Sequence, residues 1–73
     1  MEKVNTNLVN WAVVCVNEFA RRLKLTPKTA FHYLQTFGAI EFIKEHYEAE
    51  HLLSLDDVVD DLSIICRNNG GNF

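Results

Sequence analysis

The sequence has few of the residues that build metal or redox sites. Its two cysteines, Cys15 and Cys66, lie far apart and form no closely spaced pair. Zinc-binding and thiol-redox motifs need cysteines a few residues apart, so neither kind of site is expected. A disulfide between the two would need oxidising conditions, and we expect both thiols to be reduced and buried.

Long hydrophobic runs are also lacking. The longest unbroken one, residues 11–16, is far too short to span a bilayer, and the first residues have no signal-peptide pattern. The composition is 48% hydrophobic and 23% charged, which is too apolar for a disordered chain. We therefore expect a soluble, cytoplasmic protein with its own core and no membrane partner.

Glycine and proline are scarce, with three glycines and one proline in 73 residues. Gly70 and Gly71 are adjacent but have no helical pattern after them, so they do not form a phosphate-binding loop. A chain of this length holds one modest core and has little material left to enclose a deep active site. The small size of the chain therefore disfavours catalysis, and we expect a protein that is not an enzyme and has no cofactor.

Apolar residues recur at three- and four-residue spacing, which is typical of helices. The pattern predicts four helices at about 6–23, 27–37, 39–48 and 55–67, followed by a loose tail at 68–73. Thr26 before Pro27 is a strong helix start, and Ser54 with Asp57 has the spacing of a capping box. We expect an all-α, compact single-domain bundle over residues 1–73, with the first helix at its centre.

The first predicted helix is apolar on two sides. Its stripes are Leu8, Trp11, Cys15, Phe19 and Leu23 on one side, and Val9, Val13, Val16 and Ala20 on the other. A helix of this kind is buried on both sides, either within the domain or against a partner. Leaving Trp11, Val9 or Val13 uncovered would expose an apolar patch, so we expect them to contact another protein or a second copy in a homodimer.

Charge is segregated along the chain, although the net charge is only −3. A basic group is followed by an acidic group in the last predicted helix: Arg21, Arg22, Lys24 and Lys28, then Asp56, Asp57, Asp60 and Asp61. Such separation favours oriented docking. Like charges at this density repel one another, so the acidic group is a candidate interface for a basic partner.

DNA binding by a helix-turn-helix in residues 19–37 is the alternative hypothesis. Apolar residues fill the packing positions of that motif, and its candidate DNA contacts are Arg21, Arg22, Lys24, Lys28, His32 and Gln35. Two features count against it. Lys24 stands at the turn position that glycine usually fills, and the acidic half of the chain would repel DNA if it lay on the same side.

The histidines lack the spacing of a metal site, because His46 and His51 would lie on different sides of a continuous helix. Tyr47 and His51 lie one helical turn apart. A buried phenol and imidazole both need partners, which Asp60 or Asp61 could supply. We expect a structural polar clasp of Tyr47 and His51 at the bend before the last helix; a hydrolase or transferase built on this pair is the third and weakest hypothesis.

Four segments in this order and spacing resemble a family of short bacterial proteins that is catalogued only as a domain of unknown function. They are residues 14–20 (VCVNEFA), 25–28 (LTPK), 47–51 (YEAEH) and 60–62 (DDL). The resemblance covers nearly the whole chain from Trp11 onward. It implies a small helical protein without an established activity, whose genes often stand beside those of ADP-ribosyltransferase-like proteins, as in toxin–antitoxin modules.

The resemblance also implies which residues of this chain carry the family's recurrent polar groups. It places the polar pair on Tyr47 and His51 and the acidic pair on Asp60 and Asp61. Glu50 departs from the family, which commonly has an apolar residue before the histidine. Our main hypothesis is a non-catalytic protein–protein interaction module, antitoxin-like or an accessory partner of a neighbouring ADP-ribosyltransferase-like enzyme.

Overall fold

The computed structural model describes residues 6–73, and every regular element in that range is an α-helix. The helices are α1 (Thr6–Leu23), α2 (Pro27–Thr36), α3 (Ala39–Glu45), α4 (Tyr47–Glu50) and α5 (Leu55–Asn68). The predicted all-α class is confirmed, and the four predicted helices correspond to α1, α2, α3 and α5. None of the described helices is long and apolar enough to cross a membrane.

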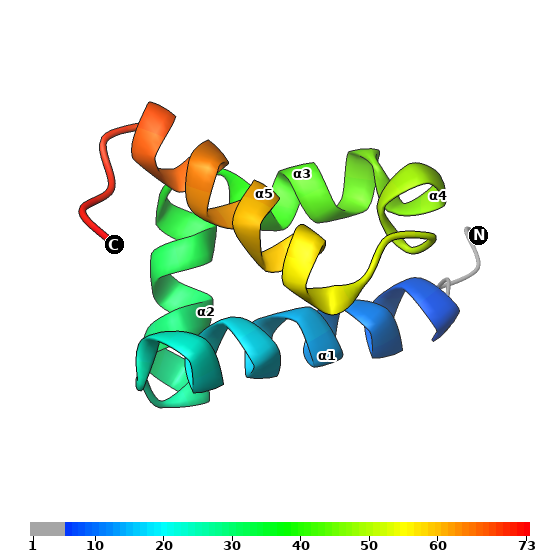
Figure 1. The fold of residues 1–73 in the computed structure, drawn as a ribbon, viewed down its shortest axis with the longest axis horizontal. Helices are drawn as coiled ribbons and strands as arrows, with labels where there is room; N and C mark the ends of the chain where they lie inside the picture. Colours follow the sequence, from blue (N-terminus) through cyan, green and yellow to red (C-terminus); the bar gives the residue numbers. More distant parts are fainter. Residues whose placement is uncertain (1–5) are drawn as a thin grey trace, which may run out of the picture.

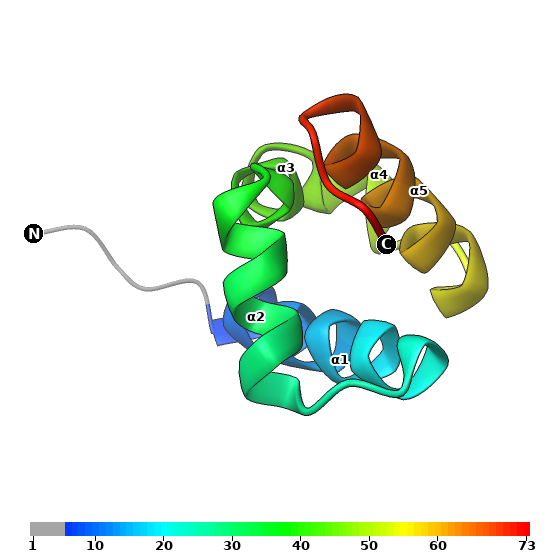
Figure 2. The ribbon, with the colours of Figure 1, turned by 90° about the vertical axis from the view of Figure 1, so that its left-hand side faces the viewer.

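The four longer helices surround the core together. In Figure 1, α1 forms one long edge, α2 crosses the end where α1 finishes, and α3 and α5 lie above α1. Seen from that end, the four helices surround the middle of the molecule, with α2 running along one side between α1 and α3 (Figure 2). Each of these four helices contacts the other three. The expected central position of the first helix is therefore wrong, because α1 keeps one side at the surface.

Each longer helix contributes to one hydrophobic core. The largest fully buried side chains are Phe19, Leu34, Ile43 and Leu62, which come from α1, α2, α3 and α5 in turn. Both cysteines are buried in this core as free thiols, as the sequence predicts. Full burial of a leucine or phenylalanine stabilises the fold by about 1.5–3 kcal/mol, so these four side chains bind the helices to one another.

The helix starts that the sequence predicts are present. The side chain of Thr26 accepts a hydrogen bond from the backbone N–H of Thr29 (3.1 Å), and Pro27 is the first residue of α2. Ser54 accepts one in the same way from the N–H of Asp57 (3.2 Å) at the start of α5. Each cap satisfies a backbone donor that the helix leaves unpaired and contributes about 1 kcal/mol.

The third predicted helix is interrupted at His46, which was not expected. The backbone of His46 leaves the helical region (φ −114°, ψ 20°), so that α3 ends at Glu45 and α4 begins at Tyr47. The segment contains neither glycine nor proline, so local preference does not cause the break. Tertiary packing outweighs helix propensity here: the break accompanies burial of Glu50 and contact of the Tyr47 ring with Trp11.

The last residues fold back onto α2, which differs from the loose tail that the sequence predicts. The backbone N–H of Phe73 donates to the hydroxyl of Tyr33 (3.0 Å), and the two rings lie 4.6 Å apart. Arg67 Nε donates to the carbonyl oxygen of Phe73 (3.1 Å). Gly71 passes so close to Tyr33 and to the carbonyl oxygen of Cys66 that there is no room for a β-carbon.

We predict that Gly71→Ala destabilises the protein. The added β-carbon would lie 2.9 Å from the carbonyl oxygen of Cys66 and would also collide with the Tyr33 hydroxyl. A collision with backbone has to be relieved by moving the tail, which costs about 1–2 kcal/mol and lowers Tm by several degrees. Thermal unfolding followed by circular dichroism measures this, with the exposed Asn72→Ala as control. Equal Tm values for the two variants would show that the tail is not held against Tyr33.

Candidate functional site

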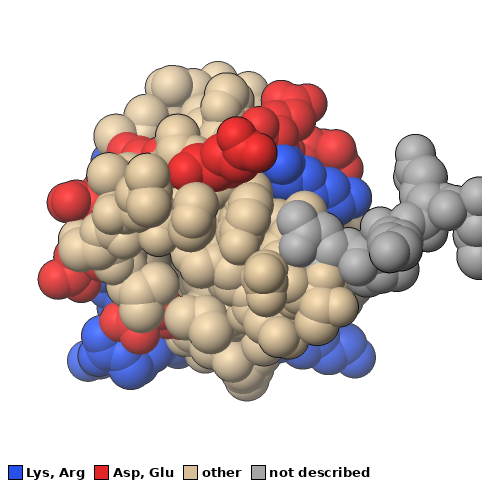
Figure 3. Space-filling model, turned by 90° about the vertical axis from the view of Figure 1, so that its right-hand side faces the viewer, with Lys and Arg blue, Asp and Glu red and all other residues tan. Residues whose placement is uncertain are grey.

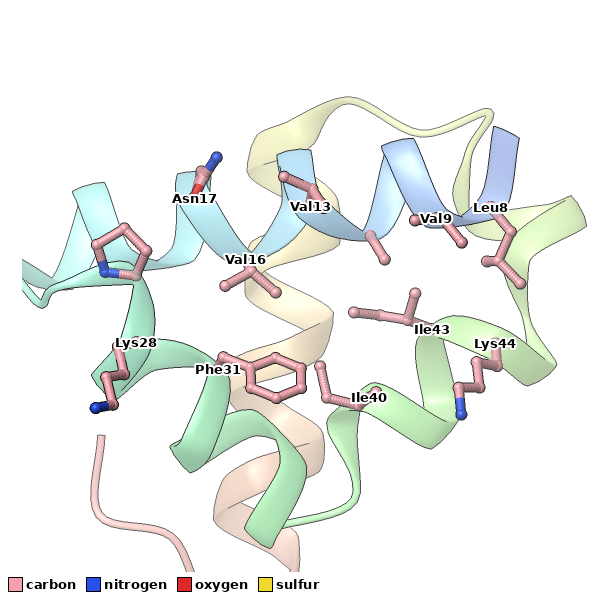
Figure 4. A pocket seen from close by; sticks show the side chains of 12 residues that line it. Leu8, Val9, Val13, Val16, Asn17, Lys28, Phe31, Ile40, Ile43 and Lys44 are labelled. Atoms are coloured by element: carbon pink, nitrogen blue, oxygen red, sulfur yellow. The ribbon is translucent and has the colours of Figure 1, made fainter. Parts of the chain in front are cut away.

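An apolar groove lies between α1, α2 and α3. Its volume is about 500 Å³, and apart from Asn17, Lys28 and Lys44 every residue that lines it is apolar. Figure 4 shows Phe31 and Ile40 on the α2 and α3 side of the groove, across from the valines of α1. The lining residues are Leu8, Val9, Ala12, Val13, Val16, Asn17, Pro27, Lys28, Phe31, Ile40, Ile43 and Lys44.

The groove exists because the second stripe of α1 is covered along only part of its length. Val16 and Ala20, in the second half of the helix, are buried. Val9 and Val13, in the first half, remain 48% and 53% exposed. The difference has a geometric cause, because α2 crosses α1 only at its end and leaves the first turns open (Figure 1). The expected uncovered apolar face of the first helix is therefore present at Val9 and Val13.

Trp11 and Phe31 each lie differently from what helical periodicity alone suggests. The sequence places Trp11 with the valines as an uncovered residue, but the Trp11 ring is half-buried and packs edge-on against the Tyr47 ring (5.4 Å), away from the groove. Phe31 fits the inward pattern of the second helix, yet it is 40% exposed on the wall of the groove. A two-sided helix pattern does not reveal which side the neighbouring helices cover.

Charged side chains lie at the edge of the groove. Lys28 and Lys44 stand near opposite ends of its α2 and α3 side (Figure 4). Lys44 pairs with Glu41 over 3.4 Å, and both side chains are exposed, whereas Lys28 forms no ion pair with any residue in the range 6–73. At the end of the molecule where α1 begins, charged atoms gather around the border and leave the middle uncharged (Figure 3).

The basic group and the acidic group are partly paired within the chain. Arg22 Nη1 binds the carboxylate of Asp60 at 2.6 Å, and Nη2 binds that of Asp56 at 2.9 Å. The hydrogen bond with Asp60, followed by that with Asp56, raises the pKa of the Arg22 guanidinium. Arg21 pairs with Glu18 one turn earlier, which lowers the pKa of that carboxyl. The expected interface at Asp56, Asp57, Asp60 and Asp61 is therefore partly occupied by the protein's own arginine.

The connection between α1 and α2 has the left-handed residue that the sequence places at Lys24. Its φ is +57°, which costs a non-glycine residue about 1 kcal/mol. The N–H of Leu25 donates to the carbonyl oxygen of Ala20 (2.8 Å) and closes the end of α1. Lys28, His32 and Gln35 are exposed on α2. Of the candidate DNA contacts, Arg21 and Arg22 are held by carboxylates, which leaves Lys24, Lys28, His32 and Gln35 at the surface.

Tyr47 and His51 lie together, but neither uses the aspartates that were expected as partners. The two rings stack with centroids 4.6 Å apart, and His51 Nδ1 lies 2.7 Å from the carbonyl oxygen of Tyr47. His51 is exposed, so its imidazole needs no buried partner. Asp60 is bound to Arg22, and Asp61 lies beside Glu50 instead. The clasp therefore closes α4 on itself and does not open into the groove.

A buried carboxyl group, with a second carboxyl beside it, is the feature that sequence reasoning missed. Glu50 of α4 is only 8% exposed, and its Oε1 has no hydrogen-bond partner. Burial, and then hydrogen bonding and repulsion with Asp61 of α5, raise the pKa of Glu50 to about 7. The one available signal was that Glu50 stands where the resembled family commonly has an apolar residue, because an apolar residue there indicates a buried position.

The thiols of Cys15 and Cys66 are unreactive. Burial, and to a smaller extent the charge of Glu50, raise the pKa of Cys15 to about 12, and burial raises that of Cys66 to about 11. Only the thiolate is a strong nucleophile or metal ligand, so both cysteines are protonated and unreactive near neutral pH. No three His, Cys, Asp or Glu side chains of residues 6–73 come together as a metal site would require.

Comparison with known proteins gives one match. A family model described as "Protein of unknown function (DUF3791)" matches residues 10–69. The chain belongs to this family. This confirms the predicted membership of a family of unknown function, while the gene association with ADP-ribosyltransferase-like proteins stays a prediction. No curated protein and no solved structure matches the chain. The DUF3791 match includes every groove residue except Leu8 and Val9.

We predict that Glu50→Gln stabilises the protein at pH 8 and has little effect at pH 5. The folded-state pKa of Glu50, about 7, lies above the ordinary value of 4.5. The folded state then holds the proton more tightly than the unfolded state, so stability is highest below about pH 4.5 and falls as the pH rises through about 7. Glutamine cannot ionise beside Asp61, and the gain at pH 8 should be about 1–3 kcal/mol.

Urea unfolding at several pH values measures this effect, with the exposed Glu48→Gln on the same helix as control. The three groups that face one another here are Glu50, Asp61 of α5 and Cys15 of α1. Cys15 stays protonated through this range, so it adds no pH dependence of its own. A difference between Glu50→Gln and the parent protein that is the same at pH 5 and pH 8 would contradict the raised pKa.

Proposed function

We propose that this DUF3791 protein is a non-catalytic interaction module that binds a partner protein in the groove between α1, α2 and α3. The observation that carries the proposal is the open stretch of apolar surface at Val9, Val13 and Phe31, each at least 40% exposed within one concave site. Contiguous apolar surface of this kind marks interaction sites, since leaving it in water is unfavourable. Binding a partner would remove it from water.

The chemistry of the described residues supports binding over catalysis. The thiols are protonated, His51 is bound to the backbone of its own helix, and the groove is lined by no acid and no histidine. A nucleophile with an adjacent base is therefore not assembled in this groove. The lysines at its edge suit orientation of a charged partner, because exposed charges act chiefly on the rate and geometry of docking.

DNA binding through α2 is the second candidate, and the exposed Lys28, His32 and Gln35 favour it. It ranks below protein binding because Arg21 and Arg22 are already paired with carboxylates. Phosphate contacts supply much of the affinity of DNA-binding proteins, and breaking these ion pairs would offset part of that gain. Salt-sensitive binding to duplex DNA that is lost in Lys28→Glu would favour this candidate.

The proposal is tested by affinity capture from native lysate with two matched variants. Val13→Glu places a charge in the groove, and Ile64→Glu places one on α5 at a residue of similar exposure, 51% against 53%. A partner that binds the groove should be recovered at least about tenfold less by Val13→Glu, since burying an unpaired charge costs several kcal/mol. Ile64→Glu should recover as much of it as the parent protein.

Circular dichroism verifies that both variants fold. Mass spectrometry identifies the partner, for which the sequence-based expectation is an ADP-ribosyltransferase-like protein. A stoichiometric partner that Val13→Glu retains in full would move the binding site away from the groove. Recovery of no partner by the parent protein at low salt would contradict the interaction role itself.

A further inference from the structure

We propose that the occupant of the groove is an amphipathic α-helix of another protein, with an apolar ridge and acidic residues along one edge. This inference rests on the function proposed above and names the kind of partner that the groove fits. Three features carry it: the length of the groove along α1, the positions of the two lysines, and the absence of a suitable helix among the described residues of the chain itself.

The length of the groove matches a short helix. Its lining runs along α1 from Leu8 to Asn17, and a helix rises about 1.5 Å per residue, so this wall is roughly 13 Å long. A helix that presents apolar residues at positions i, i+3 or i+4, and i+7 covers about the same length. Across from this wall, Phe31 of α2 and Ile40 and Ile43 of α3 line the groove (Figure 4).

The charges of the groove are all basic and lie on one side. Lys28 and Lys44 stand on the α2 and α3 side near its two ends, and Asn17 is the polar residue on the α1 side (Figure 4). The pair of Lys44 with Glu41 is long and exposed, and such pairs are worth only a few tenths of a kcal/mol. A bound helix that is acidic on the edge facing α2 and α3 would therefore meet complementary charge at both ends.

A second copy of this chain fits the groove poorly. Two grooves facing each other in a symmetric dimer would bring the lysines of both copies into the interface, and no acidic residue lines either groove to pair with them. The acidic helix of the chain is α5, but it uses its apolar residues Val58, Val59 and Leu62 in its own core. Its exposed large apolar side chains are Leu55 and Ile64, which lie nine residues apart and form no continuous ridge. The expected homodimer is thus the less favourable occupant.

Selection from a displayed helix library tests the charge of the partner without knowing its identity. The probe is a library of helices of about four turns, with apolar residues fixed at i, i+3, i+4 and i+7 and the flanking positions open to Asp, Glu, Lys, Arg and Ser. We expect binders to be enriched about tenfold in Asp and Glu on one edge. Selection on the double variant Lys28→Glu, Lys44→Glu should reverse the preference to Lys and Arg.

Three results would overturn this inference. The selected helices could be enriched in basic residues or in no charged residue. The library could yield no binders. The selected helices could also bind Val13→Glu as well as they bind the parent protein. Sedimentation of the protein alone should show a monomer; a dimer that Val13→Glu dissociates would make the second copy the occupant. The function proposed above fails separately, if the partner captured from lysate is indifferent to Val13→Glu. If Val13→Glu loses that partner but the library shows no acidic preference, only the inference of an acidic amphipathic helix fails, and the proposed function stands.

Discussion

Packing of α1 against the rest of the bundle is the constraint on which the other features depend. Phe19 fixes its inner stripe among α2, α3 and α5, and the crossing of α2 over the end of α1 buries Val16 and Ala20. Residues 6–73 form no further helix that covers the first half of the second stripe. Val9 and Val13 consequently stay at the surface and form, with residues of α2 and α3, the wall of the groove. The proposed binding role rests on this incomplete coverage.

Electrostatic interactions hold the opposite side of α1. Arg22 binds Asp56 and Asp60 in the first turns of α5, so the end of α1 is fastened to the start of α5. The buried carboxyl of Glu50 lies beside that of Asp61 of α5 and near Cys15 of α1, which is a destabilising arrangement when both carboxyls are charged. The charge segregation seen in the sequence is thus partly used within the fold, while Lys28 and Lys44 at the groove stay exposed.

Much of the fold could be predicted from the sequence, because its helices carry clear local signals. The caps at Thr26 and Ser54 and the break at Gly38, whose φ is +81°, each arise from one or two residues and were predictable. The groove was predictable only in part. Periodicity identified Val9 and Val13, but the contribution of Phe31 depends on how α2 crosses α1, and that angle is set by side chains from several helices together. Burial of Glu50 likewise depends on a break in α3 that no local residue marks.

The most direct test of the central claim is the solvent exposure of valine methyl groups, measured by NMR with a soluble paramagnetic agent. With the groove open to solvent, the methyl signals of Val9 and Val13 should broaden strongly, while those of Val58 and Val59, which are fully buried, should stay sharp. Methyl signals of Val13 as sharp as those of Val58, in a dilute monomeric sample, would contradict the claim. They would mean that the chain covers its own groove, and the reason for a partner would disappear.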